Sequence, residues 1–207
     1  DAEPVSFEHI IQATATFQRG VVSANARYDQ ALAGTARLDA AEERGRKLFF
    51  SEQAQCSGCH SGYTFSDQRI DTATDSAKTP FHNTGLYNID GKGGFPAPNR
   101  GVFEITGIAQ DMGAFRAQSL RNVAVTGPYM HDGSIATLEE VLDFYAAGGR
   151  NLTSGPFAGD GRNNPFKSDL ITRIDLDAQE KADLVAFLKT LTDETLLTSP
   201  RYATPFN

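Results

Sequence analysis

Two cysteines and a histidine stand together in the stretch Cys56-Ser57-Gly58-Cys59-His60, and these are the only two cysteines among the 207 residues. Two thiols separated by two residues and followed directly by an imidazole form the attachment pattern of c-type haem. One turn of chain presents both sulfurs to the same porphyrin edge, where each adds to a vinyl group, and carries the imidazole to the iron. The spacing predicts one covalently bound haem c, attached through Cys56 and Cys59, with His60 as the proximal iron ligand.

Other roles for the two thiols fit the sequence less well. A disulfide between them would close a very small loop, and the stabilisation by a disulfide grows with loop length. A thioredoxin-like redox pair follows a strand in a βαβ frame, which is not visible here. A zinc site would need a second pair of ligands at short spacing, whereas the remaining histidines, His9, His82 and His131, are scattered singly.

The chain as a whole is acidic, with 19 Lys and Arg against 26 Asp and Glu and a net charge of −7. This charge argues against a nucleic-acid or anionic-membrane partner and favours a cationic one. No apolar run approaches the roughly 20 residues that cross a bilayer, and no secretion signal opens the chain. Because haem is attached to such motifs outside the bacterial cytoplasm, we expect a periplasmic protein whose export signal has been removed.

Hydrophobic periodicity and capping residues predict a mainly helical chain. A long helix over residues 6–32 begins at Ser6 and carries an apolar stripe that something must cover. Gly45 is costly inside a helix unless another helix crosses closely there, and the C-terminal helix is the natural partner. Tyr145 lies on the apolar face of its helix, where most tyrosines are simply part of the core. Capping boxes, in which a polar residue is followed three positions later by Glu, open three further helices, at Asp39, Thr137 and Asp177.

The segment between residues 61 and 118 has little periodicity and is rich in Gly, Pro, Asn and Asp. Loops this long inside a compact domain are usually functional or mobile. A haem could serve as their core, and an ordinary surface loop is the alternative. A glycine-bearing helix just before the haem motif, crossed by a terminal helix, resembles the cytochrome c frame. We therefore expect an all-α, cytochrome c-like domain with long haem-wrapping loops and an extra N-terminal helix. The candidates to pack on the haem are Phe65, Phe81, Leu86, Tyr87 and Phe103.

Several stretches together resemble a known family. The longest is FRAQSLRNVAVTGPYMHDGS, residues 115–134, followed by TLEEV at 137–141 and DFY at 143–145. Upstream lie SANARYD at 23–29 and FHNTG at 81–85. Over nearly the whole chain these motifs are similar to the bacterial dihaem cytochrome c peroxidase and MauG superfamily, and together they are far more specific than the haem motif alone.

The resemblance implies a division of the chain. Members of that family normally carry two c-type haems in two domains, one reacting with hydrogen peroxide and one passing or sharing oxidising equivalents. This chain has one attachment motif and resembles the C-terminal domain, preceded by the helix that closes the N-terminal one. The expected units are residues 1–34 for that helix and 35–207 for the c-type cytochrome domain, working with a second haem domain or chain of the same enzyme.

The resemblance also suggests the sixth iron ligand. In peroxidases of the family this ligand of the C-terminal haem is a methionine, whereas MauG-like members have a tyrosine at the place that aligns with Tyr145. We favour Tyr145, with Met130 as the alternative and an open or water-filled position as the third choice. Phenolate stabilises ferric and higher iron, whereas a thioether favours the ferrous state and raises the potential.

Other expected site residues concern the haem propionates and calcium. Arg116, Arg121 and His131 are candidate partners of the propionates, because buried carboxylates need charged or hydrogen-bonding neighbours; the alternatives are surface charges and, for His131, a structural imidazole. The family holds a calcium ion between its haems, partly through backbone carbonyls in the segment that matches Thr126 and Pro128. Its remaining protein ligand lies in the other domain, so the resemblance implies only part of a calcium site here.

Two functions remain open from the sequence. The preferred one is the C-terminal haem domain of a MauG-like or peroxidase-type oxidoreductase that relays or stores oxidising equivalents from hydrogen peroxide. The alternative is a stand-alone monohaem cytochrome c that transfers electrons. The expected partners are a periplasmic electron donor or a protein substrate, with no nucleic acid and no membrane span. If the apolar stripe of the 6–32 helix has no partner within the chain, we expect a second domain to cover it.

Overall fold

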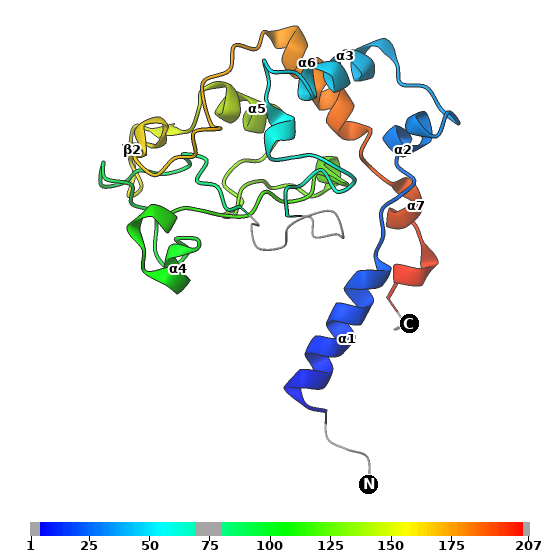
Figure 1. The fold of residues 1–207 in the computed structure, drawn as a ribbon, viewed down its shortest axis with the longest axis horizontal. Coiled ribbons are helices and arrows are strands. Elements are labelled where there is room, and N and C mark those ends of the chain that lie inside the picture. The colour runs from blue at the N-terminus through cyan, green and yellow to red at the C-terminus, as the bar shows by residue number, and fades with distance from the viewer. Residues whose placement is uncertain (1–4, 69–79, 205–207) are drawn as a thin grey trace.

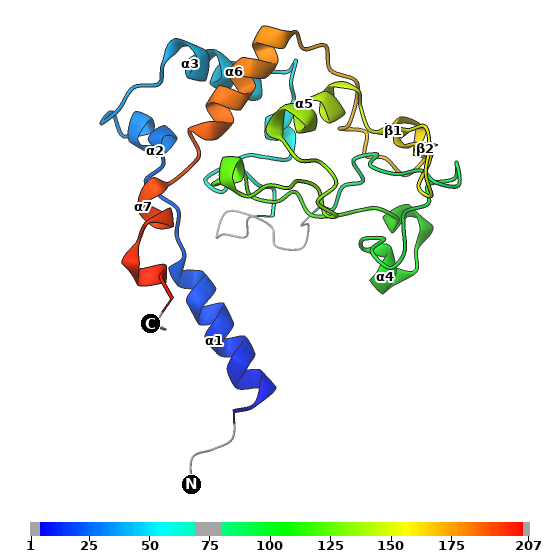
Figure 2. The same ribbon diagram turned by 180° about the vertical axis from the view of Figure 1, so that it is seen from behind.

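The structure is a computed structural model that describes residues 5–68 and 80–204. A rounded, loop-rich body lies beneath a group of helices, and helix α1 extends away from it (Figures 1 and 2). The predicted mainly helical fold is confirmed, with one two-stranded antiparallel sheet, β1–β2, as the addition among the described residues. The helices are α1 (Phe7–Gly20), α2 (Arg27–Leu32), α3 (Ala40–Phe49), α4 (Phe103–Thr106), α5 (Leu138–Ala146), α6 (Ala178–Lys189) and α7 (Glu194–Leu197), and the strands are β1 (Asn151–Leu152) and β2 (Gly159–Asp160).

Each of the three predicted capping boxes begins a helix of the body. Asp39 opens α3, Thr137 opens α5 and Asp177 opens α6, each accepting a hydrogen bond from the backbone N–H three residues later, while the Glu there caps in return. Such caps satisfy helix N–H groups that have no partner within the helix. The sequence therefore located the starts of these helices correctly.

Helices α3 and α6 cross at Gly45, as predicted. A Cβ atom at Gly45 would lie 1.9 Å from the Asp183 carbonyl oxygen and 2.9 Å from the Phe187 Cβ atom. The crossing is fastened by Arg44, whose Nε and Nη2 atoms donate to the Asp183 carboxylate at 2.6 and 2.8 Å. Phe49 is the last residue of α3, and its ring packs at a tilt against the ring of Phe187 across the crossing.

Two buried clusters form the interior. The first gathers aromatic rings from α2, α3, α6 and the loop after the haem motif, and its edge-to-face contacts hold Tyr28 against Phe65 and Phe187. The second lies on the side of α5 and the 61–118 segment, and contains Leu86, Tyr87, Phe95, Ile135 and Phe144. Of the expected haem-packing candidates, Phe65, Leu86 and Tyr87 are buried, Phe103 is half-buried and Phe81 is exposed.

The predicted helix over residues 6–32 is wrong in one respect, because it is two helices. Residues 21–26 between α1 and α2 run without helical structure. The backbone N–H groups of Ala24 and Asn25 donate to Asp193 Oδ2, both at 2.9 Å. A carboxylate from the other end of the chain therefore takes donors that a continuous helix would have used internally.

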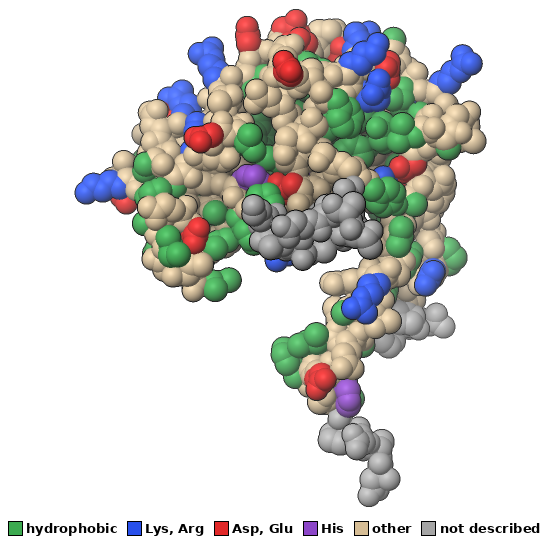
Figure 3. Space-filling view, in the orientation of Figure 1, with side chains coloured by type: hydrophobic (Ala, Val, Ile, Leu, Met, Phe, Trp, Pro, Cys, Tyr) green, Lys and Arg blue, Asp and Glu red, His purple; other side chains and the backbone are tan. Residues whose placement is uncertain are grey.

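Helix α1 leaves its apolar stripe largely exposed. None of its residues is buried, and Phe7, Ile10, Ile11 and Phe17 each keep between 52% and 77% of their surface exposed. Figure 3 shows hydrophobic side chains gathered towards its far end. Near its C-terminal end, Tyr202 contacts Phe17 edge to face and donates to the Gly20 carbonyl. Among the described residues no helix is long and apolar enough to span a membrane.

Candidate functional site

Cys56 begins a 3-10 turn, Cys56–Gly58, and Cys59 follows its last residue; residues 50–55 separate this turn from the end of α3. The turn closes through a hydrogen bond from the His60 N–H to the Cys56 carbonyl at 3.0 Å. Both thiols are free and half-buried. Burial raises the pKa of the Cys56 thiol to about 11. The structure therefore supports the motif's geometry, in which one turn offers two thiols from the same stretch of chain, and contains no disulfide between them.

The His60 ring is oriented by the loop that follows it. Its Nδ1 atom lies 3.1 Å from the Phe65 carbonyl oxygen. A carbonyl only accepts, so Nδ1 carries the proton and Nε2 keeps its lone pair. Burial lowers the His60 pKa, so the ring is neutral at ordinary pH. A neutral imidazole fixed through one nitrogen is the form that ligates a metal through the other.

Tyr145 approaches the motif from α5. Burial raises the pKa of its phenol, and the nearby Cys59 and Cys56 sulfurs raise it further. Its side chain is half-buried, and its hydroxyl forms no hydrogen bond with another residue in 5–68 or 80–204. A half-buried phenol near two free thiols and a pre-oriented imidazole fits a covalently attached haem.

Met130 lies close to the same region. It packs against the second buried cluster, as Tyr145 does, and its backbone is left-handed with φ of 68°. A non-glycine residue in that conformation is uncommon and directs its side chain differently from a helical residue. Both candidates for the sixth ligand therefore line the same interior, and neither is displaced to the surface.

The three predicted propionate partners have different surroundings. Arg116 is exposed, with its guanidinium 5.6 Å from the centre of the Phe81 ring. The Arg121 side chain is buried and already binds Asp29. His131 stacks on Phe115 at 3.9 Å between ring centres, and burial lowers its pKa. Arg121 thus has protein partners that the sequence did not reveal.

Sequence reasoning missed the pair formed by Asp67 and His82 beside the motif. His82 Nε2 lies 2.6 Å from Asp67 Oδ2, and both groups are close to the Cys59 sulfur, with all three ligand atoms within 4.8 Å. The pKa of His82 is raised to about 9, chiefly by its hydrogen bond with the free Cys59 thiol, with Asp67 adding to the effect and burial opposing it. The only sequence feature that singled out His82 was the FHNTG stretch. These three side chains could bind a metal only while the Cys59 thiol is free, which the haem motif argues against.

Two buried polar atoms near these elements form no hydrogen bond among the described residues, Thr64 Oγ1 and Arg150 Nη2, although the latter lies 3.9 Å from Asp132 Oδ2. Thr64 belongs to the loop that orients His60, and Arg150 lies over the ring of Tyr87 in the second cluster. Buried polar groups are normally satisfied, so the Thr64 hydroxyl is available to a further acceptor. At Thr126 and Pro128 the backbone is exposed, and neither carbonyl accepts a hydrogen bond from another described residue.

Comparison with known proteins gives relatives of one kind. A solved MauG-like protein associated with microbial copper homeostasis is 59% identical with a TM-score of 0.94, over 100% of this chain and 59% of that one. The methylamine utilization protein MauG of Methylorubrum extorquens is 37% identical over 93% of this chain and 46% of its own length. The cytochrome-c peroxidase IdrP1 of Denitromonas iodatirespirans is 38% identical over 86% of this chain and 48% of its own.

No family model matches the chain. The chain spans about half the length of the curated relatives it matches. The similarity nevertheless extends through the haem motif, α5 and the crossing of α3 and α6, because it covers most of this sequence. On these grounds the chain belongs to the MauG and cytochrome c peroxidase superfamily of haem proteins.

Proposed function

We propose that this chain is the C-terminal haem domain of a periplasmic, MauG-like or peroxidase-type oxidoreductase, and that it relays or stores oxidising equivalents from hydrogen peroxide. The observation that supports this most is the position of Tyr145, whose half-buried phenol lies near Cys56 and Cys59 and forms no hydrogen bond with another described residue. A haem bound there would supply an iron that changes oxidation state. The protein's part is to hold the group, to orient His60 and to keep Tyr145 in place.

Tyr145 is proposed as the sixth ligand, and this choice determines the role. A phenolate is anionic and stabilises ferric and higher iron. If His60 and Tyr145 both held the haem iron, this site would offer peroxide no open position. The motifs place no histidine or carboxylate to act as acid or base on that side. Peroxide is therefore expected to react in a second haem domain, and this domain receives the oxidising equivalent.

The exposed face of α1 supports the existence of that second domain. Phe7, Ile10, Ile11 and Phe17 form an apolar stripe that stays more than half exposed, with only Phe17 touched by Tyr202 among the described residues, and the curated relatives are about twice as long. An exposed stripe of this kind usually marks a contact surface. We propose that α1 packs on the second haem domain, and that the Thr126 and Pro128 carbonyls supply part of a calcium site between the two.

A stand-alone electron-transfer cytochrome remains the second candidate because Met130 lies in the same interior as Tyr145. Thioether ligation would favour the ferrous state and give a high potential. The two candidate functions therefore predict different ligand atoms at the iron, the Tyr145 oxygen or the Met130 sulfur, which spectroscopy can distinguish.

Stopped-flow mixing of the haem-loaded 207-residue chain with one equivalent of peroxide tests the relay. We expect slow and incomplete spectral change, because no coordination position is open. The Tyr145→Ala variant, which vacates that position, is the matched control and should react faster. Rapid, stoichiometric oxidation of the unaltered chain would show that its own haem is the peroxide site, and the relay assignment would be wrong.

A further inference from the structure

The loop that orients His60 is held from outside the haem motif. Arg121 Nε donates to the Tyr63 carbonyl at 2.8 Å, and its guanidinium lies 4.3 Å from the centre of the Tyr63 ring and 5.7 Å from that of Phe65. Ser119 Oγ donates to the Thr64 carbonyl at 2.6 Å. Two consecutive carbonyls of the loop are therefore fixed by one short segment of chain, immediately before the carbonyl that accepts from His60.

The carbonyl of Phe65 depends on this support. Phe65 has a left-handed backbone with φ of 51°, and it is 2% exposed. A bulky residue in that conformation is strained and persists only when its surroundings impose it. The contacts of Arg121 with Tyr63 and Phe65 are part of those surroundings, so they determine where the Phe65 carbonyl points.

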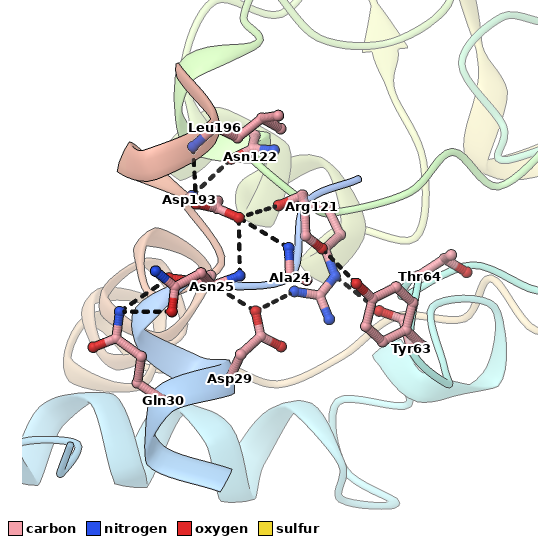
Figure 4. A network of polar contacts seen from close by, with 12 residues as sticks. Ala24, Asn25, Asp29, Gln30, Tyr63, Thr64, Arg121, Asn122, Asp193 and Leu196 are labelled. Atoms are coloured by element: carbon pink, nitrogen blue, oxygen red, sulfur yellow. Dashed lines mark hydrogen bonds and ion pairs between the residues drawn. The ribbon is translucent and has the colours of Figure 1, made fainter. Parts of the chain in front are cut away.

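Arg121 is itself held by Asp29. Its Nη1 atom donates to Asp29 Oδ2 at 2.6 Å, and the two side chains are only 8% and 16% exposed. Figure 4 shows the guanidinium between Asp29 and Tyr63. Asp29 Oδ2 also accepts from the Ala26 N–H at 2.9 Å, at the start of α2. A largely buried ion pair of this kind is costly to break from one side, because it leaves an unpaired charge.

We propose that Arg121, held by Asp29, is a positioning residue that sets the hydrogen bond on His60 and thereby the reduction potential of the haem. This inference rests on the proposed haem binding. A carbonyl that accepts from Nδ1 gives the imidazole more anionic character, makes it a stronger ligand and favours ferric iron. The sequence suggested a propionate partner for Arg121, whereas its contacts give it a role on the proximal side.

The same contacts connect the haem site to the segment that precedes α2. Residues Ala24 and Asn25 are tied to Asp193, and α2 follows them directly. A displacement of this segment would reach His60 through Asp29, Arg121 and the loop at Tyr63. The proximal ligand is therefore linked to the stretch of chain that carries α1.

The test compares the midpoint potential and the ferric electron-paramagnetic spectrum of haem-loaded variants. Arg121→Gln should move the ferric/ferrous equilibrium towards ferrous by on the order of tenfold, about 59 mV for a one-electron couple. Asp29→Asn, which keeps the size of the side chain, should shift it in the same direction by less. The double variant should shift it by less than the sum of the two, because both act through one contact.

Arg27→Gln is the matched control. Arg27 also lies on α2, pairs with Glu42 at 3.0 Å and donates to the Arg37 carbonyl at 2.8 Å, but it has no contact with the 63–65 loop among the described interactions. The midpoint potential and the ferric spectrum of Arg27→Gln should match those of the unaltered protein, even if the substitution lowers the melting temperature.

Unchanged potential and spectrum in both Arg121→Gln and Asp29→Asn would overturn the proposal, and so would equal shifts in Arg27→Gln. If Arg121→Gln does not fold, Asp29→Asn decides by the same criteria. Failure of the proposed haem site would be recognised separately, because the unaltered protein would then release its pigment into acidified acetone.

Discussion

A methyl carbon at Gly45 would lie 1.9 Å from the carbonyl oxygen of Asp183. This distance is far shorter than any stable contact, so α3 and α6 can cross as they do only with glycine at this position. Helix α3 ends at Phe49, and residues 50–55 connect it to the Cys56–Gly58 turn, so the crossing anchors the chain close to the haem motif.

The Gly45→Ala substitution should destabilise the protein. Alanine gains about 1 kcal/mol in helix propensity, but the clash with backbone atoms of α6 forces the helices apart and costs more, for a net loss of about 2 kcal/mol or greater. Chemical denaturation of the haem-loaded protein measures the effect. Gly20→Ala is the control, because its nearest neighbour would be a flexible Arg201 atom at 3.5 Å; equal effects of the two substitutions would contradict the close crossing.

Covalent haem attachment is the second prediction. The pigment should stay with the protein in acidified acetone, because two thioether bonds hold it. In the Cys56→Ser, Cys59→Ser double variant any haem that remains should be extractable. Release of pigment from the unaltered protein would exclude covalent attachment.

Axial ligation by Tyr145 is the third prediction. Tyr145→Phe should change the ferric optical and electron-paramagnetic spectra and raise the midpoint potential, because an anionic ligand that favours ferric iron is lost. Met130→Leu should leave both nearly as they were. The opposite pattern would assign the ligand to Met130 and favour the electron-transfer candidate.

The fourth prediction concerns the pH dependence of stability at Asp193. Burial raises its pKa, but hydrogen bonds from the Thr195 hydroxyl and the backbone N–H groups of Asn25, Leu196 and Ala24 outweigh this and lower it to about 2. Because the folded value lies below the ordinary 3.8, the carboxylate stabilises the fold by about 2 kcal/mol above pH ~4, and this contribution is lost as the pH falls towards 2.

Asp193→Asn should therefore lower the free energy of unfolding at neutral pH and flatten its decline between pH ~4 and ~2. Denaturant titrations at a series of pH values give both quantities. The exposed Asp169→Asn is the control for removal of one negative charge. An unaltered acid limb in Asp193→Asn would show that another carboxylate dominates acid unfolding.

Local patterns explain which parts of the molecule the sequence could predict. The capping boxes at Asp39, Thr137 and Asp177 act within one turn of helix, so the sequence places them directly. The close approach at Gly45 followed from the cost of a glycine inside a helix. The haem motif likewise depends on five consecutive residues.

Features set by distant parts of the chain were not predictable. The break between α1 and α2 results from Asp193, about 170 positions away in the chain, and no periodicity signals it. Asp67 and His82 lie in stretches without regular structure, and Arg121 reaches Asp29 on α2 from another such stretch. In such a segment, tertiary contacts rather than local propensity determine which side chains meet.

The hydrogen bonds of Asp193 also bear on how the protein opens locally. One carboxylate accepts from backbone N–H groups at both ends of the chain, Ala24 and Asn25 on one side and Leu196 on the other. These amides cannot be released to solvent one end at a time without leaving a buried charge partly unsatisfied. Their hydrogen exchange should therefore proceed in a single opening event, so that the two terminal regions form one cooperative unit in the native-state ensemble.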